Sequence, residues 1–195
     1  MTRLTHRFND ALTYAFQLHK NQYRKGTGVP YLTHLLGVTA LVLEAGGDED
    51  QAIAALLHDA VEDQGGRKTL DEINRRFGDR VAEIVDGCTD TYASPKPSWR
   101  KRKENYLEHL RTSPPYIRKV ALADKIHNAR SILFDLKSHN DKVWRRFNGG
   151  KEGTLWYYRS LVNIFQEIEP SPIVDELSKI VEEIESYPRI EEKDG

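Results

Sequence analysis

An apolar run that ends abruptly in ionisable side chains constrains this chain more than any other part of its sequence. Residues 52–57 are all alanine, isoleucine or leucine, and His58, Asp59, Glu62 and Asp63 follow within six positions. On a helix, residues three or four apart share a face, so His58 would lie beside Glu62. The same spacing relates Asp59 to Asp63. Charged groups at the end of a buried helix are costly unless a partner, such as a cation, pairs them. The stretch therefore predicts a core helix that carries a polar site.

The rest of the chain reads as a series of amphipathic helices separated by glycine and proline. Asp48 is typical of a helix N-cap, and the pattern from Thr69 to Glu72 is that of a capping box, which predicts a helix start at Thr69. No segment shows the alternation of a strand. We therefore predict an all-α fold, a compact multi-helix bundle. The expected helices are about 8–19, 34–45, 48–64, 69–77, 81–86, 99–110, 115–132, 155–165 and 173–184.

Length, charge and composition exclude several classes of protein. A chain of 195 residues predicts one domain. The net charge of −1 argues against a general nucleic-acid binder. No apolar run reaches the about 18 residues of a membrane span, and residues 1–16 do not resemble a signal peptide. The single cysteine, Cys88, fits a reducing compartment, so the cytoplasm is the expected location. The oligomeric state stays open.

Three of the expected helices each bring metal-binding groups into apolar surroundings: His34 lies on one, His58 and Asp59 on another, and Asp124 on a third. Two imidazoles and two carboxylates suit Mn, Fe or Zn and leave coordination positions open for water and substrate. A lone histidine on an apolar face is more often a core residue, but four such groups on three separate apolar helices rarely arise by chance. His19 and His127 are alternative metal ligands.

Two further acidic residues, Glu62 and Asp63, are either solvated at a helix end or placed to activate a water and protonate a leaving group. Beside a metal cluster, the second interpretation is favoured. Asn128 lies four residues beyond Asp124, so both side chains should face the same cavity.

Cationic residues flank this constellation in two places. Arg24 and Lys25 lie in a loop with two glycines and a proline, where a solvated cation is the ordinary interpretation, although the planar guanidinium of Arg24 can also stack on a flat ring. A basic run, Trp99 to Lys103, opens a helix after the polar segment Thr89 to Ser98. Its cations are either simply solvated or form a clamp for phosphate charge, the candidates being Arg100, Lys101 and Lys103.

Three separated motifs carry a family resemblance. They are Tyr23-Arg24-Lys25 with Gly28-Val29-Pro30-Tyr31 and His34, then His58 to Asp63, then Asp124 to Asn128. In this order they resemble the HD phosphohydrolase superfamily, and more narrowly the hydrolase domain of the Rel/SpoT enzymes and the stand-alone small alarmone hydrolases. We expect a single HD-type domain over residues 1–195, with a core of about 5–135 and a helical C-terminal extension of about 136–187.

The resemblance implies a role for each candidate. His34, His58, Asp59 and Asp124 would hold one Mn²⁺ ion, Glu62 and Asp63 would serve the attacking water, Arg24 and Lys25 would contact the nucleotide, and Asn128 would reach the ribose. The implied reaction removes pyrophosphate from the ribose of guanosine tetra- or pentaphosphate and leaves GDP or GTP. Gln64 and Asp90 differ from the threonine and lysine usual in the long Rel/SpoT enzymes.

Two alternatives remain from the sequence alone. The chain could be an HD hydrolase that acts on another phosphorylated nucleotide, such as a nucleoside phosphate or NADPH, or a regulatory module that binds a nucleotide without turnover. Glu62 and Asp63 argue against the second alternative, because a protein that only binds needs no acid–base pair.

Overall fold

The computed structural model describes residues 2–93 and 95–188 of the chain. Within these residues every regular element is helical, apart from one isolated antiparallel bridge between Tyr23 and Pro30. The all-α prediction is therefore confirmed. The chain divides into two compact units, residues 1–124 and 125–195, and the boundary falls inside a long helix.

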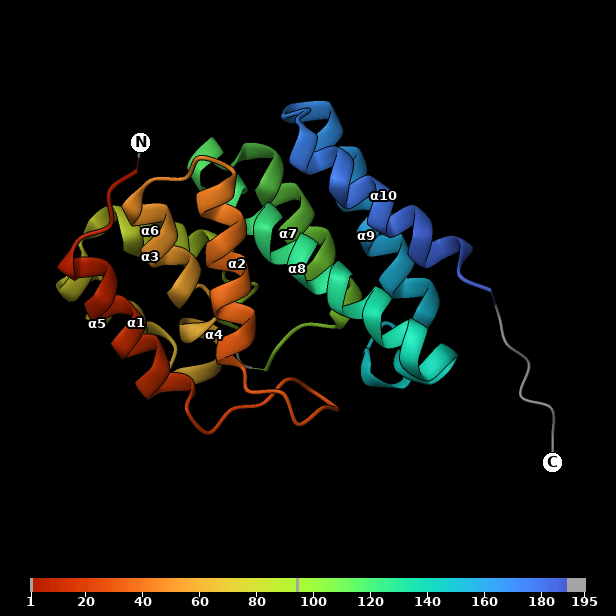
Figure 1. Ribbon diagram of the computed structural model, residues 1–195, viewed down its shortest axis with the longest axis horizontal. Helices are drawn as coiled ribbons and strands as arrows, with labels where there is room; N and C mark the ends of the chain where they lie inside the picture. Colours follow the sequence, from red (N-terminus) through yellow and green to blue (C-terminus); the bar gives the residue numbers. More distant parts are fainter. Residues whose placement is uncertain (1, 94, 189–195) are drawn as a thin grey trace. The chain divides into compact units, whose positions relative to one another are not determined.

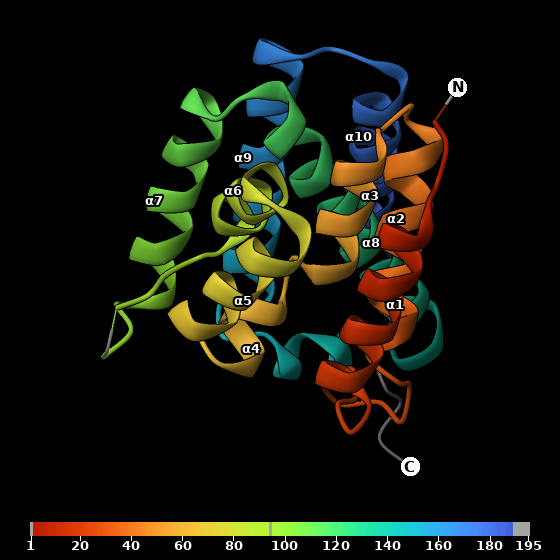
Figure 2. The same ribbon diagram turned by 90° about the vertical axis from the view of Figure 1, so that its left-hand side faces the viewer.

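The first unit is built around its third helix. The helices of this unit are α1 (His6–His19), α2 (Leu32–Glu44), α3 (Glu49–Leu57), α4 (Ala60–Gln64), α5 (Arg67–Phe77), α6 (Asp79–Cys88), α7 (Trp99–Thr112) and the start of α8 (Pro115–His139). Helix α3 packs against α1, α2 and α6 (Figures 1 and 2). Residues 51–57 of α3 are all buried, because residues 52–57 have no polar face and the Gln51 amide bonds the backbone of Asp48 and Tyr116. The central helix therefore delivers its last residues from inside the core.

Several helix boundaries differ from the sequence prediction: α8, for example, extends to His139 rather than to about residue 132. Two further differences lie in the first unit. The expected helix 48–64 is interrupted at His58 and Asp59, so that α3 ends at Leu57 and α4 begins at Ala60. Helix α5 begins at Arg67 rather than at Thr69, because Gly66 takes the N-cap position with a φ of 63°, a conformation that favours glycine. By contrast, Asp48 caps α3 in a capping box with Gln51, as its position predicts.

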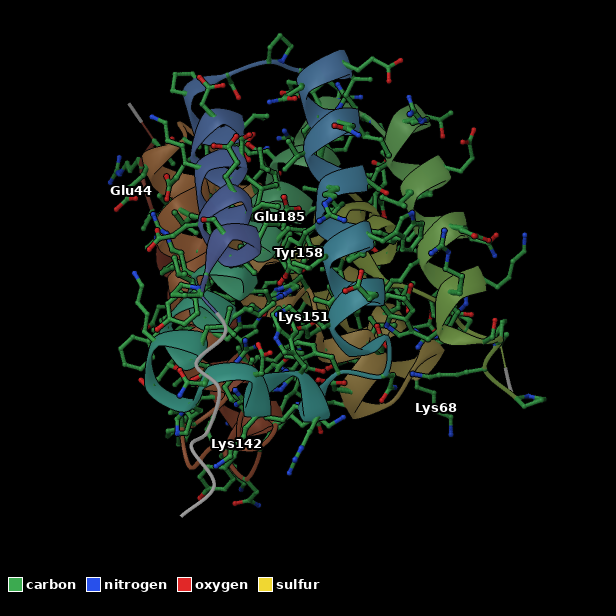
Figure 3. The ribbon with its side chains drawn as sticks, turned by 90° about the vertical axis from the view of Figure 1, so that its right-hand side faces the viewer. Glu44, Lys68, Lys142, Lys151, Tyr158 and Glu185 are labelled. Atoms are coloured by element: carbon green, nitrogen blue, oxygen red, sulfur yellow. The ribbon has the colours of Figure 1, made fainter. Side chains whose placement is uncertain are left out.

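The second unit contains the rest of α8, the 3₁₀ segment η1 (Asn140–Arg146), and the helices α9 (Gly150–Ile168) and α10 (Pro172–Ser186). Helices α9 and α10 lie side by side and are joined by a short connection (Figure 3). An ion pair links Arg159 of α9 to Glu185 of α10, and Lys151 pairs with Asp141 at 3.1 Å. The second unit is therefore held together by helix packing and by ion pairs between its own residues.

None of the helices in the described part of the chain is both long enough and apolar enough to cross a membrane.

Candidate active site

Four of the predicted metal ligands come together in the first unit. His34 is the third residue of α2, His58 is the C-cap residue directly after α3, Asp59 directly precedes α4 and Asp124 lies on α8. The Nε2 atom of His58 is 3.0 Å from Asp59 Oδ2 and 3.6 Å from Asp124 Oδ1. His34 Nε2 is 3.4 Å and 3.2 Å from the same two oxygens. Both histidines and Asp124 are buried. Four side chains from four helical segments therefore converge on one point.

The interruption between α3 and α4 explains how adjacent residues can meet there. On a continuous helix, consecutive side chains diverge by about 100°. At His58 and Asp59 the helix is broken, and both side chains turn to the same place. The predicted relation of one helical turn between His58 and Glu62 spans this interruption and stays a prediction. The relation from Asp59 to Asp63 survives, because the Asp63 N–H donates to the Asp59 carbonyl oxygen at 3.0 Å.

Hydrogen bonding fixes the tautomer of His58. Its Nδ1 atom is 2.8 Å from the carbonyl oxygen of Ala55, which can only accept, so Nδ1 carries the proton. In the neutral ring, Nε2 is then a lone-pair atom that faces two carboxylate oxygens. Acceptors that face one another at this distance need a proton or a cation between them. A backbone carbonyl behind a ligating histidine is also the usual arrangement in metal sites.

The electrostatics of the cluster agree with this geometry. Burial lowers the pKa of His58, but the carboxylates of Asp59 and Asp124 outweigh burial and raise that pKa well above its ordinary value. Burial would raise the pKa of Asp59, but the imidazoles of His58 and His34 hold it well below its usual range. The cluster therefore attracts positive charge.

The donor set fits a divalent metal ion. Ligand atoms of His34, His58 and Asp59 lie within 4.8 Å of one another, and Asp124 Oδ1 adjoins His34 Nε2. Nitrogen and carboxylate oxygen donors together suit a first-row transition metal. The hydroxyl of Tyr31 donates to Asp59 Oδ2 at 2.6 Å, and burial together with the Asp59 charge raises the pKa of Tyr31. Tyr31 thus orients a candidate ligand from behind.

The two predicted acid–base residues each face a donor from another part of the chain. Asp63 Oδ2 accepts a hydrogen bond from Gln22 Nε2 at 2.7 Å, and Glu62 Oε1 pairs with Lys96 Nζ at 3.1 Å. Partial burial and the nearby charge of Asp59 raise the pKa of Asp63. Asp63 therefore belongs to the same electrostatic environment as the metal cluster.

The predicted substrate contacts are less closely grouped. The guanidinium of Arg24 lies 5.8 Å from the centre of the Tyr31 ring, which brings it near the cluster, and Lys25 is exposed beside it. Arg100 pairs with Glu104 at 2.9 Å, Lys101 is exposed, and Lys103 is 3.6 Å from Asp90. Arg102, also of the basic run, forms an ion pair with Asp90. Asn128 and His127 lie on α8 in the second unit. The roles of these residues stay predictions.

Four residues close to the site were not assigned these contacts from the sequence. The sequence predicts no role for Tyr31, although this residue belongs to one of the family motifs. It predicts His19 only as an alternative metal ligand, whereas the His19 Nδ1 atom contacts Gln22 Oε1 at 2.7 Å. Gln22 lies in a loop. Lys96 is the single lysine of the segment Thr89 to Ser98, and this isolation in a polar segment was the one signal that could have pointed to it.

Comparisons with known proteins agree on one family. Residues 11–155 match the family described as the HD domain. The chain is 38% identical over 138 residues to the MESH1 guanosine-3′,5′-bis(diphosphate) 3′-pyrophosphohydrolase of Xenopus tropicalis, which covers 69% of this chain and 72% of that protein. An enzyme of the same activity from Aquifex aeolicus is 36% identical over 135 residues, 68% of this chain but 19% of its own length.

A solved structure of a related protein has the same fold as this chain. It belongs to a metazoan ortholog of SpoT described as hydrolysing ppGpp, and it superposes with a TM-score of 0.76 at 25% identity. The superposition covers 94% of this chain and 98% of that one. Because the family match spans most of the sequence and includes His34, His58, Asp59 and Asp124, the chain belongs to the HD domain family.

Proposed function

We propose that this chain is a metal-dependent hydrolase that removes the 3′-pyrophosphate of guanosine tetra- and pentaphosphate. The convergence of His34, His58, Asp59 and Asp124 on one point, beside Glu62 and Asp63, carries the proposal. The activity named for the Xenopus and Aquifex relatives supports the choice of substrate. The products would be GDP or GTP and intact pyrophosphate.

The four ligands would hold one divalent ion, and we propose Mn²⁺, with Fe or Zn as the alternatives that the same donors accept. Such an ion, when bound, makes water a competent nucleophile near neutral pH and neutralises phosphate charge. Tyr31 would keep Asp59 in position through its hydroxyl. The metal preference depends on the donor atoms rather than on the substrate, so the two parts of the proposal can be tested separately.

The remaining residues would handle protons and the nucleotide. Glu62 and Asp63 would accept the proton of the attacking water and stabilise the leaving ribose oxygen as it takes up a proton. Water oxygen would bond to the phosphorus next to the 3′-oxygen, and the bond from that phosphorus to the 3′-oxygen would break. Arg24 would stack on the nucleotide base, and the Lys25 ammonium group would bind the negatively charged phosphates. Asn128, Arg100, Lys101 and Lys103 are proposed as further substrate contacts.

A panel of phosphorylated nucleotides, assayed with Mn²⁺ and with identified products, tests the proposal. We expect guanosine tetraphosphate to be cleaved to GDP and pyrophosphate in preference to nucleoside phosphates and NADPH. Release of orthophosphate, or preference for another nucleotide, would reassign the substrate. Tight binding without turnover at any metal concentration would instead indicate a non-catalytic nucleotide-binding module. We also propose that the protein works in the cytoplasm and acts on a small molecule rather than on nucleic acid or a membrane.

A further inference from the structure

Gln22 connects three side chains at the edge of the candidate active site. It lies in the segment between α1 and α2, at 41 positions before Asp63 in the chain. Its Nε2 atom is 2.7 Å from Asp63 Oδ2. Its Oε1 atom is 2.7 Å from His19 Nδ1 and 2.6 Å from Gln64 Nε2. One amide thus uses its donor end on Asp63 and its acceptor end on two other residues.

The chemistry of an amide makes this arrangement directional. An ionised carboxylate can only accept, so the Gln22 atom that faces Asp63 must be the NH₂ nitrogen, and a hydrogen bond to a carboxylate is stronger than one between neutral groups. The Gln22 oxygen is then left for the NH₂ group of Gln64. Rotating the Gln22 amide by 180° would place its oxygen against the Asp63 carboxylate and its NH₂ against the NH₂ of Gln64. Both contacts would be repulsive.

His19 reinforces the same orientation. It is buried, with 1% of its surface exposed, and its Nε2 atom has no hydrogen-bond partner among the described residues. A protonated Nε2 would be costly there, so Nδ1 carries the proton and donates to Gln22 Oε1. The His19 ring also stacks on Tyr31, with centroids 5.4 Å apart and an interplanar angle of 16°. Tyr31 in turn bonds Asp59, so His19 supports both acidic residues at once.

We propose that Gln22 is a positioning residue that holds the Asp63 carboxylate for hydrolysis, and that His19 and Gln64 set the direction of its amide. This inference rests on the proposed function, because Asp63 is there assigned a part in proton transfer. The Gln22 side chain bonds His19, Asp63 and Gln64, and none of these is a proposed metal ligand. The hydrogen bond from Gln22 limits the rotation of the Asp63 side chain, which lies on the short helix α4. Without this bond, the Asp63 carboxylate would rotate more freely in solvent.

The Gln22→Met variant tests the positioning role. Methionine has nearly the same length and volume but cannot make these hydrogen bonds. We expect kcat to fall about 10–100-fold, the scale of one hydrogen bond to a charged group, with KM and metal content unchanged. Gln17→Met is the matched control, since Gln17 is an exposed glutamine on α1, and it should leave kcat unchanged. If Gln22→Met folds poorly, the Gln22→Glu variant provides a second test of the positioning role. It places a carboxylate against Asp63 and should lower kcat further, and full activity in either variant overturns the inference.

A double-mutant cycle with Asp63→Ala separates positioning from a merely structural effect. If Gln22 acts through Asp63, Gln22→Met should change kcat less than about threefold in the Asp63→Ala background. An equal loss in both backgrounds would show that Gln22 acts elsewhere and would overturn this inference while leaving the proposed function intact. Wild-type turnover of Asp63→Ala alone would overturn both the assignment of Asp63 and the role of Gln22.

Discussion

Two groups of acidic residues lie side by side in the first unit, and they are satisfied in different ways. In the buried cluster, Asp59 and Asp124 face the Nε2 atoms of two histidines, so acceptors point at acceptors unless a proton or a cation lies between them. In the neighbouring pair, Glu62 and Asp63 face the donors Lys96 and Gln22. Side chains of the protein supply donors to the second group, whereas the first group has room for a cation. Under the proposed function, this difference separates the residues that would hold the metal from those that would handle protons.

The largest effect should come from removing a ligand of the first group. His58→Ala deletes one of the two imidazoles, and we expect both metal content and activity to be lost, because the remaining carboxylates would repel each other. Elemental analysis and turnover measure the two effects. His6→Ala, at the exposed start of α1, is the control. Full metal content in His58→Ala would remove this residue from the ligand set.

The second group should separate chemistry from metal binding. Glu62→Gln keeps the shape of the side chain but cannot accept a proton, so kcat should fall about 10²–10⁴-fold. Metal content should not change, since Glu62 faces Lys96 and not the cluster. Glu108→Gln, on the exposed side of α7, serves as the control. Loss of metal in Glu62→Gln would instead make Glu62 a ligand, and unchanged turnover would exclude it from proton transfer.

An intermediate effect should follow from the residue that orients Asp59. Tyr31→Phe removes the hydroxyl that donates to Asp59 Oδ2 but keeps the ring that stacks on His19. We expect metal affinity to fall about 10–100-fold, the usual cost of losing such a support. Titration of the metal-free protein with Mn²⁺ measures it. Tyr116→Phe removes a hydroxyl that bonds Glu83 and should leave the affinity unchanged. Equal affinity in both variants would show that Asp59 needs no support from Tyr31.

The smallest effect should come from Lys96. The side chains of Lys96 and Glu62 are 53% and 27% exposed, and exposed ion pairs contribute only about 0–1 kcal/mol. Lys96→Met should therefore change kcat/KM by no more than about fivefold through Glu62. Lys68→Met is the matched control, because Lys68 extends into solvent from α5 (Figure 3). A much larger loss, confined to the most highly phosphorylated nucleotides, would show that Lys96 contacts substrate phosphate.

Sequence patterns predicted most of the helices and the cluster of candidate metal ligands, because both depend on regular spacing. The apolar stretch 52–57 predicted the central helix, and the positions of His34, His58, Asp59 and Asp124 on apolar segments predicted their convergence. The interruption at His58 and Asp59 was not predicted, since no glycine or proline marks it. The contacts of Gln22 and Lys96 could not be predicted either, because each reaches a partner more than thirty residues away from a segment without periodicity.

The adjacency of His58 and Asp59 has a consequence for the unfolded chain. Two proposed ligands joined by one peptide bond would form a chelate that needs no folding to assemble, so the denatured protein should retain some affinity for transition metals. Affinity for the unfolded state subtracts from the stabilisation that a ligand gives the native state. The stabilisation would then depend mainly on His34 and Asp124, which lie on distant helices and meet the pair only in the folded unit.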